Sequence, residues 1–177
     1  MERIPADTWH TYAGHIERYE WAAQWCADHL DPGATVNDVA CGVGYGAQVL
    51  RNRGALTDLK YRGYDKPGVP DPSFPGEFHG CDLDAEGWLP ETADATFCFE
   101  TLEHVQDPAV LAYKLARTTR RALFVSVPVV PTVHQWHWHL HDFTEADIPP
   151  LFAGFHVAED WAQPRELSHV WRLERNT

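Results

Sequence analysis

The stretch that decides the fold is Asp38-Val-Ala-Cys-Gly-Val-Gly-Tyr-Gly46, in which three glycines follow an apolar run at 34–40. The run ATVNDVA is typical of a buried strand, and the glycines let the following backbone approach a ligand closely. A helix is expected from the end of this loop to Arg53, where Gly54 ends it. A strand, a glycine loop and a helix in this order indicate an α/β protein.

The rest of the chain continues the alternation of strands and helices. A helix over 8–30 precedes the glycine loop, with Asp7 or Thr8 as its cap, and a second helix, capped by Asp107, begins at Pro108. The alternation predicts a mostly parallel sheet covered on both faces. A short helix is expected from Thr144 until Pro149 breaks it. The strands are expected at 59–65, 77–82, 94–99, 120–128, 155–161 and 168–174, the last two as a closing hairpin.

Two connections depart from a regular pattern. Four prolines lie between residues 67 and 75, and a crossover helix does not survive that many, so this connection is predicted to be an irregular loop. The stretch 128–142 is rich in Pro, His and Trp and forms the one long loop. Loops of that length in compact domains are usually functional, so 128–142 is the expected substrate loop.

Length and composition exclude several classes of protein. The 177 residues predict one domain over 1–177, and 44% hydrophobic residues provide a sizeable core. The chain has 26 acidic and 14 basic residues, a net charge of −12, which argues against nucleic acid or an anionic membrane as a partner. Four widely spaced cysteines, no signal-peptide pattern and no membrane-length apolar stretch predict a cytoplasmic protein.

Acidic residues follow three successive predicted strands at the edge where open α/β sheets bind ligands. Asp65 ends the second strand, 21 residues after Gly44, where a carboxylate accepts hydrogen bonds from ribose hydroxyls. Asp82 ends the third strand, in position to accept from an adenine amino group, and Glu100 follows the fourth. These three residues predict a nucleoside-containing cofactor.

The glycine loop alone leaves the cofactor open, because Gly42-x-Gly44-x-x-Ala47 also satisfies the dinucleotide fingerprint of a nicotinamide-dependent oxidoreductase. Asp38 argues against that alternative, since it would repel a pyrophosphate but tolerate a cationic cofactor. The chain is also too short to add a separate substrate domain. A third alternative is a module that binds the cofactor without transferring anything.

The loop together with Phe99-Glu-Thr-Leu-Glu-His-Val105 resembles the class I S-adenosylmethionine-dependent methyltransferases, in particular the small-molecule branch that includes ubiquinone-pathway O-methyltransferases. The resemblance extends to Glu17-Arg-Tyr19 and to His139-Leu-His-Asp-Phe-Thr144. It implies a single Rossmann-like domain with a seven-stranded sheet in the order 3-2-1-4-5-7-6, helices on both faces, and an N-terminal helix over the cofactor site. The polar Asn37 and the proline-rich connection depart from the family pattern.

The same resemblance implies cofactor roles for matching positions. The loop containing Gly42 and Gly44 would meet the methionine part, Asp65 the ribose, and Asp82 with the Leu83 backbone the adenine. Arg18 matches an arginine that can hold the methionine carboxylate as a two-donor fork. With Asp38 and Glu100, these residues form the predicted cofactor-binding set.

Methyl transfer to a small-molecule hydroxyl needs a group that removes or weakens the hydroxyl proton. Glu100, Glu103 and His104 share one face if the fourth strand leads into a helical turn. If residues 137–141 are extended, His139 and His141 point to one side together with His137. We expect the loop to fold over the cofactor's methyl group and to bring His139 or His141 near His104.

Two versions of the chemistry remain open. In the first, His104, His139 or His141 is a general base, because neutral imidazole titrates near neutrality. In the second, Glu100, Glu103, His104 and His139 hold a divalent metal, as the resemblance to metal-dependent O-methyltransferases implies. Some of those relatives methylate small RNAs, a substrate that the charge of −12 argues against.

Overall fold

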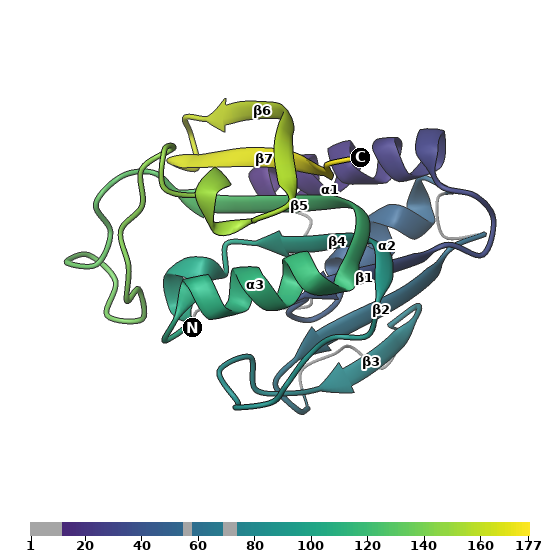
Figure 1. The fold of residues 1–177 in the computed structure, drawn as a ribbon, viewed down its shortest axis with the longest axis horizontal. Helices are drawn as coiled ribbons and strands as arrows, with labels where there is room; N and C mark the ends of the chain where they lie inside the picture. The colour runs from purple at the N-terminus through teal and green to yellow at the C-terminus, as the bar shows by residue number, and fades with distance from the viewer. Residues whose placement is uncertain (1–11, 55–57, 69–73) are drawn as a thin grey trace.

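The computed structural model describes residues 12–54, 58–68 and 74–177. Seven strands form one sheet in the order β3-β2-β1-β4-β5-β7-β6, which confirms the predicted order (Figure 1). The first five strands pair in parallel, whereas β7 is antiparallel to both of its neighbours. In chain order the elements are α1 (Ala13–His29), β1 (Thr35–Val39), α2 (Tyr45–Asn52), β2 (Lys60–Asp65), β3 (Glu77–Gly80), β4 (Ala93–Phe99), the 3-10 helix η3 (Leu102–His104), α3 (Pro108–Thr118), β5 (Thr119–Pro128), the 3-10 helix η4 (Pro149–Leu151), β6 (Phe155–Gln163) and β7 (Ser168–Arg175).

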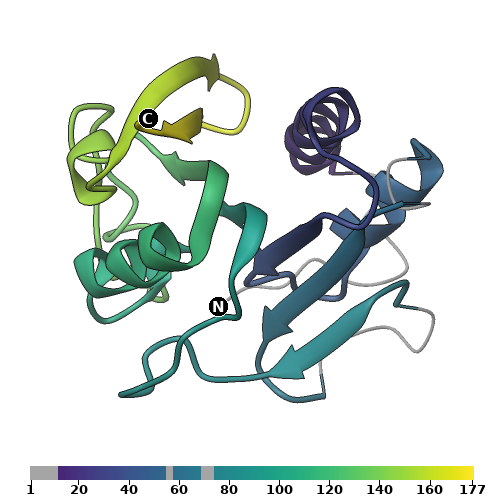
Figure 2. The same ribbon diagram turned by 45° about the vertical axis from the view of Figure 1, so that its right-hand side comes forward.

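Helices cover both faces of the sheet, as the alternation predicts. Figure 2 shows α1 and α2 on one side and α3 on the other. On the first side Ala22 and Leu50 pack in one core cluster with Phe124, and on the second Leu111 and Leu115 pack in another. All five are at most 1% exposed, and full burial of a large apolar side chain stabilises the fold by roughly 1.5–3 kcal/mol. The sheet therefore lies between two hydrophobic cores, which fix the positions of its strand ends.

The α3 helix begins at Pro108, as predicted from the sequence. Asp107 accepts hydrogen bonds from the backbone N–H groups of Ala109 and Val110, and Pro108 takes the first helical position. A carboxylate at this position satisfies donors that the helix cannot pair, which fixes the start of α3. The loop between β4 and α3 is thereby held against the edge of the sheet.

The proline-rich connection between β2 and β3 is described only at its two ends. Residues 67–68 form a turn, 66 and 75–76 are bends, and none of the described residues of this connection is helical. Pro70 and Pro72 fall within 69–73, outside the described residues. The prediction of an irregular connection is confirmed for the described ends.

Two helix predictions need correction. The first helix begins at Ala13, with Tyr12 as its N-cap; the proposed caps Asp7 and Thr8 lie outside the described residues. No helix starts at Thr144, because Asp147 accepts from both its backbone N–H and its hydroxyl and closes a turn instead. The prolines then begin η4 rather than break a helix, since proline suits a first helical position.

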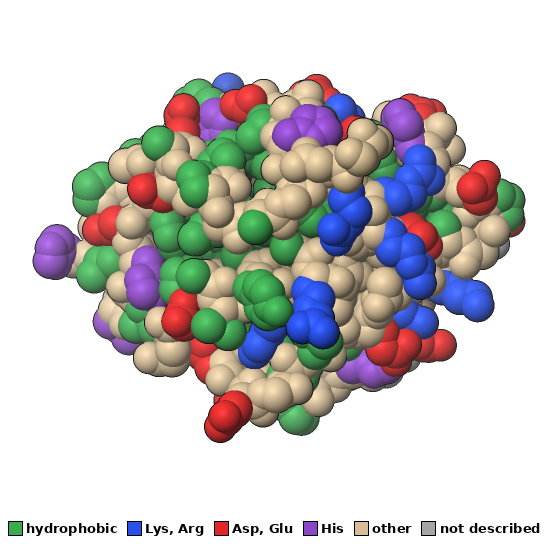
Figure 3. Space-filling model, in the orientation of Figure 1, with side chains coloured by type: hydrophobic (Ala, Val, Ile, Leu, Met, Phe, Trp, Pro, Cys, Tyr) green, Lys and Arg blue, Asp and Glu red, His purple; other side chains and the backbone are tan. Residues whose placement is uncertain are grey.

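Charge is distributed unevenly over the surface. Most Lys and Arg side chains of the face in Figure 3 gather over its right-hand half and centre, whereas histidines are scattered over the whole face. Arg120 and Arg121 lie at the amino end of β5. Among the described residues no helix combines the length and the apolar character that a membrane crossing requires.

Candidate functional site

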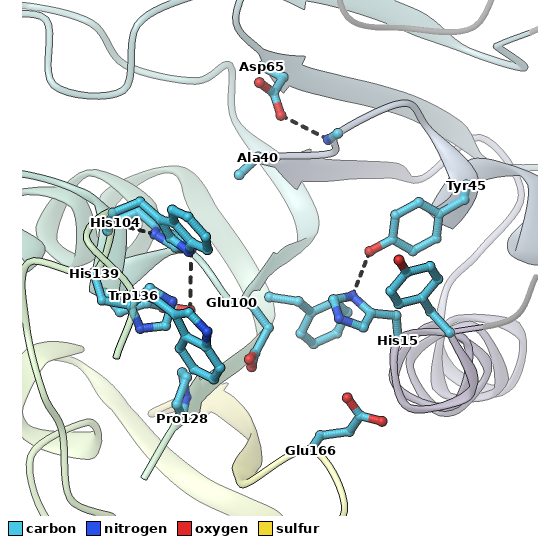
Figure 4. A pocket seen from close by; sticks show the side chains of 15 residues that line it. His15, Ala40, Tyr45, Asp65, Glu100, His104, Pro128, Trp136, His139 and Glu166 are labelled. Atoms are coloured by element: carbon cyan, nitrogen blue, oxygen red, sulfur yellow. Dashed lines mark hydrogen bonds and ion pairs between the residues drawn. The ribbon is translucent and has the colours of Figure 1, made fainter. Parts of the chain in front are cut away.

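A cavity of about 390 Å³ opens at the carboxyl ends of β1, β2 and β4 (Figure 4). A smaller cavity of about 100 Å³ adjoins it and shares Ala40, Asp65, His104 and Trp138. The larger cavity is lined by Tyr12, His15, Ala40, Gly42, Tyr45, Asp65, Phe99, Glu100, Glu103, His104, Pro128, Trp136, Trp138, His139 and Glu166. The predicted ligand edge of the sheet is thus hollowed into two joined compartments.

The glycine loop forms the wall beside β1. Gly44 caps α2 with φ = 90°, a left-handed conformation that favours glycine. A Cβ atom at Gly46 would lie 2.3 Å from the Tyr19 ring, so this position lets α1 pack closely on α2. Ala40, where β1 enters the loop, also has a left-handed φ of 65°. Such conformations at non-glycine residues are typical of functional sites.

Asp65 holds the glycine loop in shape. Its carboxylate accepts from the backbone N–H of Gly42 at 2.8 Å and from that of Lys66 at 2.6 Å. A carboxylate accepts up to about four hydrogen bonds, so it can bind ribose hydroxyls as well as amides. Asp65 lines both cavities, in agreement with its predicted place beside the cofactor.

Asp38 lies beneath the loop rather than in the cavity. It is fully buried, and its carboxylate accepts from the Tyr19 hydroxyl at 2.9 and 3.0 Å and from the Tyr61 hydroxyl. Burial raises the pKa of Asp38 to about 7, against the opposing effect of the tyrosine hydrogen bonds. The residue lines neither cavity, so its position corrects the expected direct contact with the cofactor: it supports the loop by tying α1 to β2.

Arg18 and Glu100 form a buried ion pair next to the larger cavity. Nη1 of Arg18 lies 3.2 Å from a Glu100 carboxylate oxygen, and Nε donates to the Gln163 side chain. Glu100 also accepts from the hydroxyls of Ser126 and Ser168, at 2.8 and 2.9 Å. Arg18 is 1% exposed, and its Nη2 has no hydrogen-bond partner among the described residues. Arg18, like Asp38, lines neither cavity. A buried donor without a partner is costly, so Nη2 is the group that would gain from a carboxylate placed beside Glu100.

The smaller cavity has the predicted adenine residues, Asp82 and Leu83, in its wall. Lys114 was not predicted to belong to this region, yet its ammonium group donates to the carbonyls of Leu83 and Ala85, both at 3.2 Å. Asp84 accepts from the backbone N–H of Gln106 and closes the same loop on the other side. The loop after β3 is therefore fixed by α3 and by the residues before it.

Glu103, His104 and His139 come together, with one ligand atom from each within 4.8 Å of the others. The His104 and His139 rings meet edge to face at 4.6 Å, which confirms the expected approach of a loop histidine to His104. Nδ1 of His104 bonds the Trp138 carbonyl at 3.1 Å, and Nδ1 of His139 bonds the Thr132 hydroxyl at 2.7 Å. Both Nε2 atoms are thereby turned to the cluster, the arrangement in which histidines bind metals.

The cluster keeps its histidines neutral. Burial lowers the pKa of His104, and burial together with His104 lowers that of His139 to about 4. Burial, and then the neighbouring charge of Glu100, raises the pKa of Glu103 well above its usual range. Glu103 is 1% exposed, and its Oε2 has no hydrogen-bond partner among the described residues. Glu100, predicted as a fourth ligand, is instead engaged by Arg18 and the two serines.

The loop 128–142 is not extended, which corrects the expected alternation of its histidines. Residues 133–135 and 137–138 are turns, and His141 bonds the Val105 carbonyl at 2.9 Å instead of lining either cavity. Asp142 shapes the loop, because its carboxylate accepts from the backbone N–H groups of Thr132 and Val133. Those bonds lower the pKa of Asp142 and favour the turns over a strand.

Several residues of the larger cavity were not predicted from the sequence, among them His15, Tyr45 and Glu166. His15 comes from the first turn of α1 and bonds the Tyr45 hydroxyl at 2.8 Å, and burial lowers the pKa of His15 to about 4. Tyr45 lies within the glycine motif, so its position in the sequence could have indicated that it lines the cavity. Glu166 reaches the cavity from the turn between β6 and β7, and nothing in its sequence surroundings indicates this.

No protein-family model matches the sequence, and no curated protein matches it either. The fold is similar to that of magnesium protoporphyrin IX methyltransferase (ChlM) from Synechocystis PCC 6803 with bound SAH, at a TM-score of 0.72 and 20% identity over 99% of this chain and 90% of that one. Mitomycin 7-O-methyltransferase MmcR gives 0.68 and 14% identity over 91% of this chain and 54% of its own. CalO1, a methyltransferase of calicheamicin biosynthesis in its SAH-bound form, gives 0.63 and 18% over 94% and 55%. The strand order and these likenesses show that the chain has the Rossmann-like fold of S-adenosylmethionine-dependent methyltransferases.

Proposed function

We propose that this protein transfers a methyl group from S-adenosylmethionine to a hydroxyl group of a small molecule. The observation that carries the proposal is the pair of joined cavities at the carboxyl edge of the sheet, with the glycine loop and Asp65 between them. The structural neighbours are S-adenosylmethionine-dependent methyltransferases, one of them a 7-O-methyltransferase by name.

The residues around the cavities fit this cofactor. Asp65 would accept from the ribose, and Asp82 with the Leu83 backbone would meet the adenine in the smaller cavity. Nη2 of Arg18, buried and unpartnered among the described residues, suits the methionine carboxylate. Glu100 lies beside it and suits the cationic end of the same molecule. When bound, S-adenosylmethionine supplies a methyl carbon on a positively charged sulfur; that carbon joins the acceptor oxygen as the carbon–sulfur bond breaks and leaves a thioether.

The nicotinamide alternative is weaker for a topological reason. The usual dinucleotide fold has parallel strands in the order 3-2-1-4-5-6, whereas here an antiparallel β7 stands between β5 and β6.

Glu103, His104 and His139 would hold a divalent cation. The donor set of one carboxylate and two imidazoles suits Zn²⁺ and similar ions, and each imidazole is oriented through its other nitrogen. The unpartnered Oε2 of Glu103 also supports the assignment, because a cation would relieve the cost of burying it. When bound, such a cation lowers the pKa of an acceptor hydroxyl.

The chain's own residues then position the acceptor and exclude water. Trp136 and Trp138 cover the cavity from the loop, and Tyr12 and His15 close it from α1. A bound cation would lower the pKa of the hydroxyl, so that no histidine base is required. In the metal-free version the hydroxyl proton would move to a ring nitrogen of His104 or His139.

The test begins with calorimetry, comparing S-adenosylhomocysteine with NAD. We expect S-adenosylhomocysteine to bind and NAD to bind much more weakly; the opposite order would select the oxidoreductase. A screen of hydroxyl acceptors with labelled S-adenosylmethionine follows. Binding without transfer to any acceptor would identify a cofactor-binding module.

A second experiment separates the two versions of the cluster. Bound metal is assayed in the purified protein, and turnover is measured before and after chelation. Activity that chelation removes and a divalent ion restores supports the metal. Activity that resists chelation and disappears in His104→Ala supports the base.

Four free cysteines, three of them buried, agree with the reducing cytoplasm as the site of this activity.

A further inference from the structure

We infer that the acceptor is an aromatic compound with a hydroxyl group at one end and a positively charged amine at the other, and that Glu166 selects the amine. The inference rests on the proposed methyl transfer and names its substrate class. It follows from the arrangement of charge and aromatic rings along the larger cavity.

The cavity separates its two ends. Figure 4 shows Asp65 and Ala40 on one side, Glu166 on the opposite side, and Glu100 between them. The groups assigned to the cofactor lie at the Asp65 side and around Glu100, so the space toward Glu166 is left to the acceptor. The Glu103, His104 and His139 cluster borders the same space from the loop side, where a hydroxyl would face it.

Aromatic rings line this space from separate elements. Tyr12 lies at the start of α1, Trp136 and Trp138 in the loop 128–142, and Phe99 at the end of β4. Flat rings of this kind pack on flat ligands, and they also attract cations over their faces. An aromatic ammonium compound uses both properties.

Glu166 is built into the cavity wall by the hairpin. Ser168 donates to the Glu166 carbonyl at 3.1 Å, and Leu167 adopts a left-handed φ of 57°, which together shape the turn. The buried Gln163 side chain fastens the turn to α1 by donating to the Gly14 carbonyl and to the Glu17 carboxylate, at 3.1 and 2.9 Å. A Cβ atom at Gly14 would lie 2.3 Å from Cγ of Glu166, so the missing side chain at Gly14 leaves the space that Glu166 occupies.

The acceptor end of the cavity favours a cation over an anion. Among the described residues no lysine or arginine lines the larger cavity. Of its four acidic residues, Glu100 is paired with Arg18, Asp65 is assigned to the cofactor, and burial favours the protonated form of Glu103 by raising its pKa, so Glu166 is the carboxylate left to an acceptor. The nearby Arg18 guanidinium is paired with Glu100 and Gln163. A carboxylate on the acceptor would have no basic group to meet there, whereas an ammonium group would meet Glu166.

The test uses three catechols of similar size that differ in charge: dopamine, hydroxytyrosol and 3,4-dihydroxyphenylacetate. Their dissociation constants are measured by calorimetry with saturating S-adenosylhomocysteine. We expect dopamine to bind at least about tenfold more tightly than 3,4-dihydroxyphenylacetate, with the neutral compound between them. Glu166→Gln should reduce that ratio by about three- to fivefold, the range of one partly exposed charge pair, and Glu166→Lys should reduce it further.

Glu77→Gln is the matched control, because it removes one charge from the exposed amino end of β3, away from the cavity, and should leave the ratio unchanged. If S-adenosylhomocysteine does not bind, the proposed function fails. If it binds but the three catechols bind equally, in the reverse order or not at all, the substrate class is wrong while the proposed function stands. A cation preference that survives Glu166→Gln unchanged would overturn the role of Glu166.

Discussion

The two sides of the larger cavity are built in opposite ways. On the strand side the polar groups are engaged by the protein itself: Asp65 holds backbone amides, and Asp38 holds two tyrosines. On the loop side a buried polar atom, Oε2 of Glu103, has no hydrogen-bond partner among the described residues. The difference indicates a preformed binding surface facing a reactive cluster: Asp65 is held by the protein and keeps acceptor capacity for a ligand, whereas Oε2 of Glu103 has no partner among the described residues until one enters.

The largest effect is expected on the loop side. His104→Ala and His139→Ala should each lower kcat by about 10²–10⁴-fold, the usual contribution of proton-transfer chemistry. The affinity for S-adenosylhomocysteine should not change, since neither imidazole belongs to the cofactor set. His137→Ala is the control, because His137 is exposed in the same loop. Equal turnover in all three variants would show that His104 and His139 do not take part in catalysis.

A second prediction concerns the pH dependence of stability on the strand side. Burial raises the pKa of Asp38 to about 7, whereas an unfolded aspartate has a pKa of about 3.9. Between these values the folded protein keeps a proton that the unfolded chain has released. The contribution of Asp38 to the free energy of unfolding should therefore fall by about 1.4 kcal/mol per pH unit as pH rises through this window, about 4 kcal/mol in all.

Asp38→Asn, which does not ionise, should remove this contribution. Urea unfolding of both proteins from pH 4 to 8 measures it as the difference between wild type and variant. That difference should change steadily up to about pH 7 and then level off. A difference that is constant with pH would mean that the tyrosines keep Asp38 ionised throughout.

Asp65 should affect cofactor binding and leave the loop side intact. Asp65→Ala removes two expected charge-assisted hydrogen bonds to ribose, each worth about 1.5–3 kcal/mol, and should weaken S-adenosylhomocysteine binding at least tenfold. Calorimetry measures the loss. Asp58→Ala removes an exposed acid before the amino end of the same strand and should bind normally. Unchanged affinity in a folded Asp65→Ala protein would remove Asp65 from the cofactor site.

The smallest effect is expected from replacing the residue that shapes the loop 128–142. Asp142→Ala breaks the bonds that fold residues 132–133 into place, so kcat should fall severalfold while S-adenosylhomocysteine binding is kept. Hydrogen exchange at Thr132 and Val133 should accelerate. Asp147→Ala loses comparable bonds in the neighbouring turn, outside both cavities, and should leave kcat unchanged. If both variants lose activity alike, the loss is general and not a matter of loop shape.

Features that depend on neighbours in the sequence were predictable. The glycine loop, the cap of α3 by Asp107 and the acid at the end of β2 each follow from a short pattern that restricts the backbone directly. The proximity of His104 and His139 was also predictable, because both follow strands that end at the same edge. The orientation of His141 was not, since it depends on turns that the side chain of Asp142 imposes.

The sequence by itself determined the order of elements, the edge of the sheet that binds a ligand, and the acidic residues at that edge. Local conformational preferences and the common direction of parallel strands are sufficient for these. Only the tertiary structure decided that Arg18 faces Glu100, that Asp38 faces two tyrosines, and that Glu166 reaches across Gly14. Each of these contacts joins residues far apart in the chain, and its geometry is set by how α1 and the hairpin pack against the sheet.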